Sequence, residues 1–142
     1  MRRIETTATI DAPPERVWEV LTDLDAMDEW NPFIVEAQGK PAVAERLRIR
    51  VAPPGKRPAT FTPVVLTADR PRELRWRGTL PIPGLFAGEH YFVLEPTGTG
   101  TRLRHGETFA GLLVPLMGGM LKATAEGFER MNAALKDRVE NG

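Results

Sequence analysis

Alternating apolar and polar residues divide most of the chain into short segments with the period of β-strands. Residues 2–11 alternate in this way and predict a first strand. One side of that strand consists of Ile4, Thr6, Ala8 and Ile10. Six further segments share the period or are rich in β-branched and aromatic residues. They are residues 33–38, 46–51, 59–68, 73–80, 88–96 and 101–109. Short turns separate them, which favours an antiparallel meander; Pro63 favours an edge position or a bulge.

A helical period replaces the alternation in three places. Residues 12–23 contain Pro14 followed by Glu15, which is typical of a helix start, and Val17, Trp18, Leu21 and Leu24 follow at helical spacing. Residues 24–30 predict a second short helix that Pro32 ends. A long amphipathic helix is predicted from Pro115 to about Val139. Its apolar face consists of Met117, Leu121, Thr124, Phe128, Met131 and Leu135.

The order of these segments is one strand, two short helices, six strands and a long helix. This order predicts a single α+β domain over residues 1–142, with a seven-stranded curved antiparallel sheet around the C-terminal helix. A strongly twisted sheet does not lie flat on one helix along its whole length. We therefore expect an internal hydrophobic cavity between sheet and helix, where a ligand binds.

Three titratable side chains fall on strand faces that should line this cavity. His90 shares its face with Phe92 and Leu94, and His105 and Glu107 share theirs with Leu103 and Phe109. The turn at residues 97–100 makes the two strands neighbours, with Trp76 on the next strand, whereas Tyr91 should point outward. Residues two apart on a strand lie about 6–7 Å from each other, so His105 and Glu107 flank one point without needing to touch.

Two interpretations of His90, His105 and Glu107 stay open from the residues alone. Burial raises the pKa of a carboxyl and a nearby imidazole lowers it, so Glu107 can exchange protons near neutral pH as a base or acid, with a histidine as its partner. Alternatively, the three side chains hold a ligand or satisfy backbone groups, including the start of the long helix. We favour the second interpretation. A metal site is not expected, because no further inward carboxylate supports one.

Apolar side chains on the same faces are the predicted ligand contacts. They are Trp76, Phe92, Leu103, Phe109, Met117, Leu121, Thr124, Phe128 and Trp30, the last at the cavity mouth. The apolar loop 81–88 is rich in Gly and Pro and is expected to act as a lid. Gly118 and Gly119, near the helix start, favour a deformable entrance.

Composition and charge narrow the function classes. The 19 basic and 19 acidic residues balance, so nothing draws the chain toward nucleic acid or an anionic membrane. Cysteine is absent and only two histidines occur, which excludes disulfides and His-rich metal sites. The longest apolar stretch, residues 112–121, is too short to span a membrane, so we expect a cytoplasmic protein without an integral membrane segment. Arginines on the outward faces predict a solvated surface.

The chain resembles a known family in three stretches. APPERVWEVLTDLDAMDEWNPF, LRWRG, and GEHYFVLEP with GTRLRHGETFAGLLVPL are similar to the START/Bet v 1-like superfamily, in particular its polyketide cyclase/dehydrase-like branch (SRPBCC). This resemblance implies the helix-grip fold around a hydrophobic cavity. It does not imply one activity, because the superfamily includes lipid carriers, aromatic polyketide cyclases and chaperone co-factors.

The favoured function is binding of a small hydrophobic molecule of lipid, polyketide or aromatic type, as a carrier or sensor. The alternative is a polyketide cyclase/dehydrase-like enzyme that uses Glu107 with His105 or His90 as acid–base groups. The third is an interaction module similar to chaperone activators. No cofactor and no nucleic acid partner are expected, and a homodimer is compatible with the sequence.

Overall fold

The computed structural model describes all 142 residues and contains the expected order of strands and helices. The strands are β1 (Arg2–Ile10), β2 (Ile34–Gln38), β3 (Arg48–Val51), β4 (Ala59–Phe61), β5 (Val64–Asp69), β6 (Glu73–Thr79), β7 (Ala87–Thr97) and β8 (Gly100–Ala110). The α-helices are α1 (Pro14–Thr22), α2 (Met27–Trp30) and α3 (Gly118–Asn141). Short 3₁₀ turns, η1 (Leu24–Ala26) and η2 (Val114–Leu116), precede α2 and α3.

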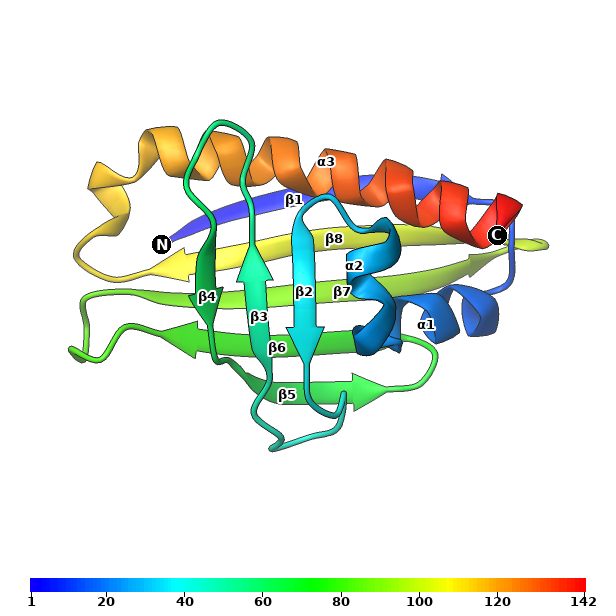
Figure 1. Ribbon diagram of the computed structural model, residues 1–142, viewed down its shortest axis with the longest axis horizontal. Helices are drawn as coiled ribbons and strands as arrows, with labels where there is room; N and C mark the ends of the chain where they lie inside the picture. Colours follow the sequence, from blue (N-terminus) through cyan, green and yellow to red (C-terminus); the bar gives the residue numbers. More distant parts are fainter.

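Eight strands form two antiparallel sheets in place of the single seven-stranded sheet expected. The larger sheet has the order β1-β8-β7-β6-β5 and the smaller one β2-β3-β4. Residues 59–68 do not form one strand, because Pro63 has no N–H for a sheet and the chain passes from one sheet to the other there. A single bridge, Arg46 with Val64, joins the strand edges at this point. The smaller sheet lies across the larger one (Figure 1).

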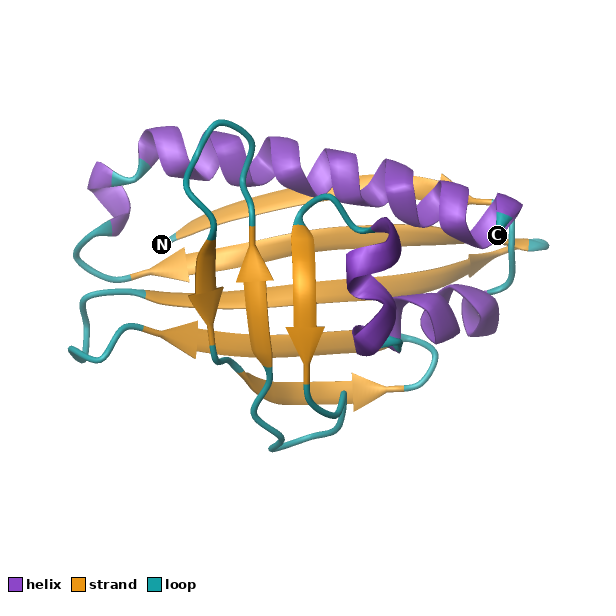
Figure 2. Cartoon of the chain, in the orientation of Figure 1, coloured by secondary structure: helices purple, strands orange, loops and turns teal.

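Helix α3 lies along β1 and β8 for most of their length, and α1 and α2 close the end of the molecule where the chain ends (Figure 2). Helix α3 begins three residues later than predicted, because Val114–Leu116 forms a separate 3₁₀ turn that contains Pro115. None of the helices combines the length and apolar character needed to cross a bilayer.

The main core fills the space between the two sheets and the second half of α3. Its fully buried side chains include Phe92, Leu103 and Phe128, which come from β7, β8 and α3. The alternation of β8 is confirmed, because Leu103, His105 and Phe109 are buried on the inner face. The inner faces of β7 and β8 therefore contact α3 through Phe128, whose ring lies against His90 and His105.

Tyr91 points away from this core, as its position on β7 predicts, but solvent does not reach it. Its ring is 1% exposed and lies beneath the guanidinium groups of Arg3 and Arg75. The hydroxyl donates a hydrogen bond to Glu5 (2.8 Å), and a Cβ at Gly106 would overlap that hydroxyl. At this point the outward face is thus one buried aromatic ring covered by charged side chains.

Candidate ligand-binding site

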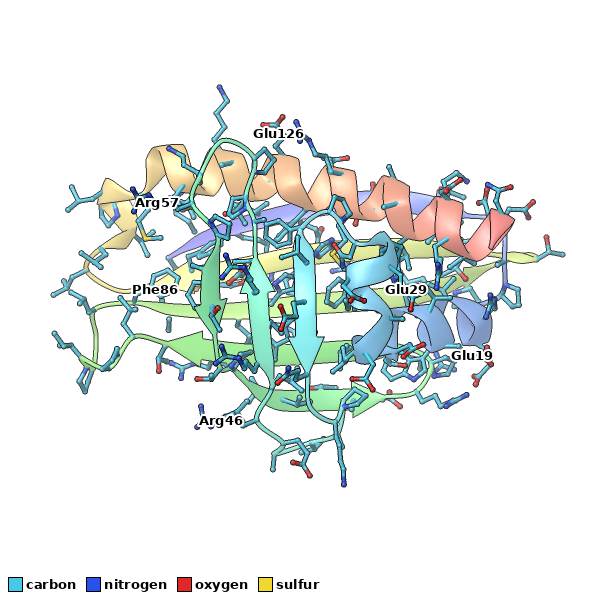
Figure 3. The ribbon with its side chains drawn as sticks, viewed as in Figure 1. Glu19, Glu29, Arg46, Arg57, Phe86 and Glu126 are labelled. Carbon is cyan, nitrogen blue, oxygen red and sulfur yellow. The ribbon has the colours of Figure 1, made fainter.

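An apolar cavity of about 260 Å³ lies between the two sheets and the first turns of α3. The smaller sheet supplies Ile49, Val51, Ala59 and Phe61 to its wall. The larger sheet supplies Trp76, Gly78, Gly88, His90, Glu107 and Phe109. Two further lining residues, Arg57 from the loop between β3 and β4 and Phe86 from the loop before β7, are labelled in Figure 3 and lie at the same end of the molecule. Apolar side chains dominate, so the cavity suits an apolar molecule.

The predicted ligand contacts divide into two groups. Trp76, Phe109, Met117 and Thr124 line the cavity. The others do not: Phe92, Leu103 and Phe128 are packed in the main core, Leu121 packs beside Phe109 and Val114, and Trp30 packs against the core from α2. The inner face of the sheet is therefore part cavity wall and part solid core.

The loop at residues 81–88 lies at the cavity, where the sequence predicted a lid. Phe86 and Gly88 line the void, and the loop is joined to the segment after β8 by two backbone hydrogen bonds. The amides of Leu112 and Leu113 donate to the carbonyl groups of Gly84 and Leu85, each over 3.1 Å. Gly118 and Gly119 do not line the cavity, although Met117 and Met120 beside them do.

Two titratable side chains, His90 and Glu107, face the cavity as neighbours on β7 and β8; we call them the polar pair. Their residues are directly opposite in the strand register. His90 Nδ1 lies 3.5 Å from Glu107 Oε1, and the two side chains are 5% and 17% exposed. Gly88 makes room for this arrangement, because a Cβ there would overlap the Glu107 carboxyl group. The hairpin therefore fixes the pair and leaves one side of it open to a ligand.

His105 lies behind His90 and does not line the cavity. Its Nε2 atom is 2.8 Å from His90 Nε2, and its Nδ1 atom is 2.7 Å from the side-chain oxygen of Asn132 on α3. The Asn132 amide donates to Thr6 Oγ1 (2.8 Å), and the Thr6 hydroxyl donates to the carbonyl oxygen of His105 (2.9 Å). A continuous row of polar groups thus runs from Glu107 at the cavity to Thr6 on β1.

Aromatic rings enclose both histidines. The Phe128 ring centroid is 4.1 Å from that of His105 and 4.9 Å from that of His90. Phe92 stacks on the other side, at 4.4 Å from His105 and 4.9 Å from His90. Trp76 adds a contact at 5.0 Å from His90. The two imidazoles are therefore almost fully buried, with His105 0% and His90 4% exposed.

Burial shifts the pKa values of all three groups toward their uncharged forms. Desolvation lowers the pKa of His90 to about 3 and raises the pKa of Glu107 to about 8. The pKa of His105 falls well below its usual value, because burial and then the neighbouring His90 outweigh the hydrogen bond to Asn132. Near neutral pH both histidines are neutral and Glu107 is mostly a carboxylic acid. The contact between His90 and Glu107 thus joins two neutral groups and is not an ion pair.

The sequence interpretation overlooked Asn132 and the wall formed by the smaller sheet. Asn132 follows Phe128 by four residues and precedes Leu135 by three, so helical spacing alone places it on the buried face. An asparagine at such a position needs a polar partner, and the inward Thr6 and His105 were candidates. The wall from β3 and β4 leaves no such signal, since their inner residues look like ordinary core.

Solved structures with the same fold cover nearly the whole chain. A protein from Thermus thermophilus, TTHA0849, is 24% identical with a TM-score of 0.75, and the match covers 97% of both chains. A START superfamily protein from Mycobacterium smegmatis is 25% identical with a TM-score of 0.75, again over 97% of both. The Zhui aromatase/cyclase from Streptomyces sp. R1128 is 19% identical with a TM-score of 0.79, over 98% of this chain and 93% of that one.

No curated protein sequence matches the chain. A family match, in contrast, extends over residues 1–140, almost the entire sequence. It agrees with the START-type neighbours and with the resemblance seen in the sequence motifs. The chain therefore belongs to the family described as polyketide cyclase / dehydrase and lipid transport.

Proposed function

We propose that the protein binds a small hydrophobic molecule in the cavity, as a carrier or sensor. The observation that carries this proposal is the cavity itself, an apolar space of about 260 Å³ with one polar pair on its wall. Ligand pockets typically measure about 300–1,000 Å³, so a compact ligand is favoured. The family description, which includes lipid transport, supports the same class of molecule.

A cavity-filling variant tests this proposal. Gly78 lines the cavity, and the only atom within 4 Å of a Cβ added there is the Cβ of Pro63 at 3.8 Å. We expect Gly78→Leu to occupy the void and to weaken binding of the neutral fluorescent probe N-phenyl-1-naphthylamine at least about tenfold, because the leucine takes the space of the probe. Titration of probe fluorescence measures this.

Thr79→Leu is the matched control, because Thr79 is the next residue on β6 and is exposed. It adds a leucine outside the cavity and should leave the probe affinity unchanged. Circular dichroism and thermal unfolding establish that both variants fold. Equal probe affinity in wild type and Gly78→Leu, or no saturable binding by the wild type, would contradict the proposal.

A second candidate function is proton transfer on a polyketide-like substrate, favoured by the polar pair. The Glu107 carboxylate would take a proton from the carbon between two carbonyl groups, giving an enolate, and would then return a proton to that carbon or to an oxygen. The structural likeness to an aromatase/cyclase is one of fold alone, so this candidate depends on the pair.

Exchange of the central protons of a β-diketone for deuterium, followed by NMR, tests the second candidate. We expect the enzyme-dependent rate to rise with pH up to about 8, where Glu107 ionises, and to fall about 100-fold or more in Glu107→Gln. Glu129→Gln, at an exposed position on α3, is the control. Undiminished exchange in Glu107→Gln would remove Glu107 from this role.

A further inference from the structure

The hydrogen-bonded row behind the polar pair has only one consistent arrangement of protons, and it starts at Thr6. The Thr6 hydroxyl has a single proton, which it donates to the His105 carbonyl oxygen (2.9 Å). Its oxygen must then accept the proton that Asn132 Nδ2 donates (2.8 Å). These two contacts fix the orientation of the Asn132 amide, with its oxygen toward His105.

The orientation of Asn132 fixes His105. Because Asn132 Oδ1 is an acceptor, His105 Nδ1, 2.7 Å away, must carry a proton. His105 is fully buried among aromatic rings and is neutral, so its Nε2 has a lone pair and no proton. The contacts among Thr6, Asn132 and His105 form a closed loop, because Thr6 donates to the backbone carbonyl of the same histidine whose side chain contacts Asn132.

The state of His105 in turn fixes His90. Two unprotonated nitrogens would repel each other at 2.8 Å, so His90 Nε2 must donate to His105 Nε2. A neutral His90 then has its lone pair on Nδ1, and that atom faces Glu107 Oε1 at 3.5 Å. A Glu107 carboxylate would face the His90 lone pair with a second lone pair at this distance, whereas a neutral carboxylic acid does not add a negative charge there. The 3.5 Å separation is longer than an ordinary hydrogen bond, so the two groups are neighbours with room for a ligand atom to bond to either.

We infer that Thr6 and Asn132 are positioning residues that hold His90 as an acceptor and Glu107 as a neutral acid, so that the polar pair binds an uncharged hydroxyl or carbonyl group of an apolar ligand. This inference rests on the proposed binding function for its ligand. The only cation that lines the cavity is Arg57, which is exposed on the loop between β3 and β4 and is not part of the row. The pair itself has no positive charge to hold a carboxylate.

The row also cannot conduct protons away from the cavity. It ends in the Asn132 amide and the His105 carbonyl, and neither group ionises under ordinary conditions. A proton that leaves Glu107 therefore goes to His90 or out on the cavity side, to the ligand or to solvent. The row orients the pair and confines proton exchange to the cavity side.

Two-bond proton–nitrogen NMR of ¹⁵N-histidine-labelled protein tests the proton positions directly. The chain has only two histidines, so four ring-nitrogen signals report the whole system. Between pH 6 and 7 we expect His105 to be protonated on Nδ1 only and His90 on Nε2 only. The opposite tautomers, or a positively charged His90 in this range, would overturn the inference.

Asn132→Leu removes the acceptor for His105 Nδ1, and we expect both histidines to lose their single tautomer. Asn141→Leu, at an exposed position on the same helix, should leave the spectrum unchanged. If Asn132→Leu does not fold, Thr6→Val removes the hydroxyl with nearly the same shape and should produce the same mixture. Unchanged tautomers in a folded variant of either kind would show that the row does not set them.

A matched pair of probes tests the ligand class. We expect 2-naphthol, a neutral hydroxyl compound, to bind at least about tenfold more tightly at pH 7 than 2-naphthoate, which has the same rings and a carboxylate. Equal or tighter binding of 2-naphthoate would overturn the assignment of a neutral group. If neither probe nor N-phenyl-1-naphthylamine binds, the proposed function fails, and the tautomer spectra still decide the proton positions on their own.

Discussion

Replacement of Phe128 by alanine is expected to lower the free energy of unfolding by about 3–5 kcal/mol. Phe128 is fully buried on α3 and packs edge-to-face on Phe33 at 5.4 Å, in addition to its contacts with both histidines. The alanine would leave a void that surrounding strands cannot close, since β7 and β8 are held in register. A typical domain has only about 5–15 kcal/mol of stability, so a large share would be lost.

Urea unfolding of the purified variant measures this loss. Phe86→Ala is the control, because Phe86 has the same side chain at a half-buried position on the cavity wall. Its loss should be about 1–2 kcal/mol, since much of that ring already faces empty space. Equal losses for the two variants would show that Phe128 has no special place in the core.

The stability of the protein is expected to be greatest near pH 6.5 and to fall on both sides. On the alkaline side, the folded-state pKa of Glu107 is about 8 and its unfolded value is 4.5, so the folded protein holds the extra proton. Stability therefore decreases as pH rises toward 8. From pH 6.5 to 8 the loss is about 1 kcal/mol, because the slope reaches 1.36 kcal/mol per pH unit only where the unfolded histidines are neutral and the folded Glu107 is still protonated, and it levels off above pH 8.

Below pH 6.5, the two histidines reverse the sign of the slope of stability against pH. The pKa of His90 is about 3 in the folded protein and 6.5 when unfolded, so the unfolded chain takes up the proton first. His105 acts in the same direction. Below pH 6.5 two histidines oppose one Glu107, and stability decreases as pH falls.

Urea unfolding at a series of pH values between 5 and 9 gives both slopes. In Glu107→Gln the alkaline decrease should disappear and the acid decrease should become steeper, because only the histidine contributions remain. Glu129→Gln should keep the wild-type curve. An alkaline slope that persists in Glu107→Gln would mean that a different group holds the proton.

The inner faces of the strands could be predicted from the sequence, but not which part of a face lines the cavity. Leu103, His105, Glu107 and Phe109 all lie inside, as the alternation of β8 requires. Alternation shows which face of a strand is inward, but it does not show whether a residue on that face lines the cavity or packs in the solid core. Phe128 fills the space opposite His105, whereas the first turns of α3 leave space opposite Glu107 and Phe109.

The order of elements and the hairpin of β7 and β8 were predictable because they depend on local patterns and one short turn. The division into two sheets was not, since it depends on how residues on both sides of Pro63 pair with distant strands. The same limit applies to Asn132, whose role depends on Thr6, 126 residues away in sequence. Both features depend on contacts between residues far apart in the sequence, and such contacts cannot be read from a single sequence.

Because the chain passes from the smaller to the larger sheet at Pro63, one wall of the cavity and its titratable groups come from different parts of the chain. The smaller sheet contributes only apolar wall, through residues such as Ile49 and Phe61, and the polar pair belongs wholly to the larger sheet. Substitutions in β3 and β4 can therefore change the shape of the cavity while His90 and Glu107 stay as they are. For the binding function proposed above, the size of the cavity and its chemistry can therefore change independently in evolution.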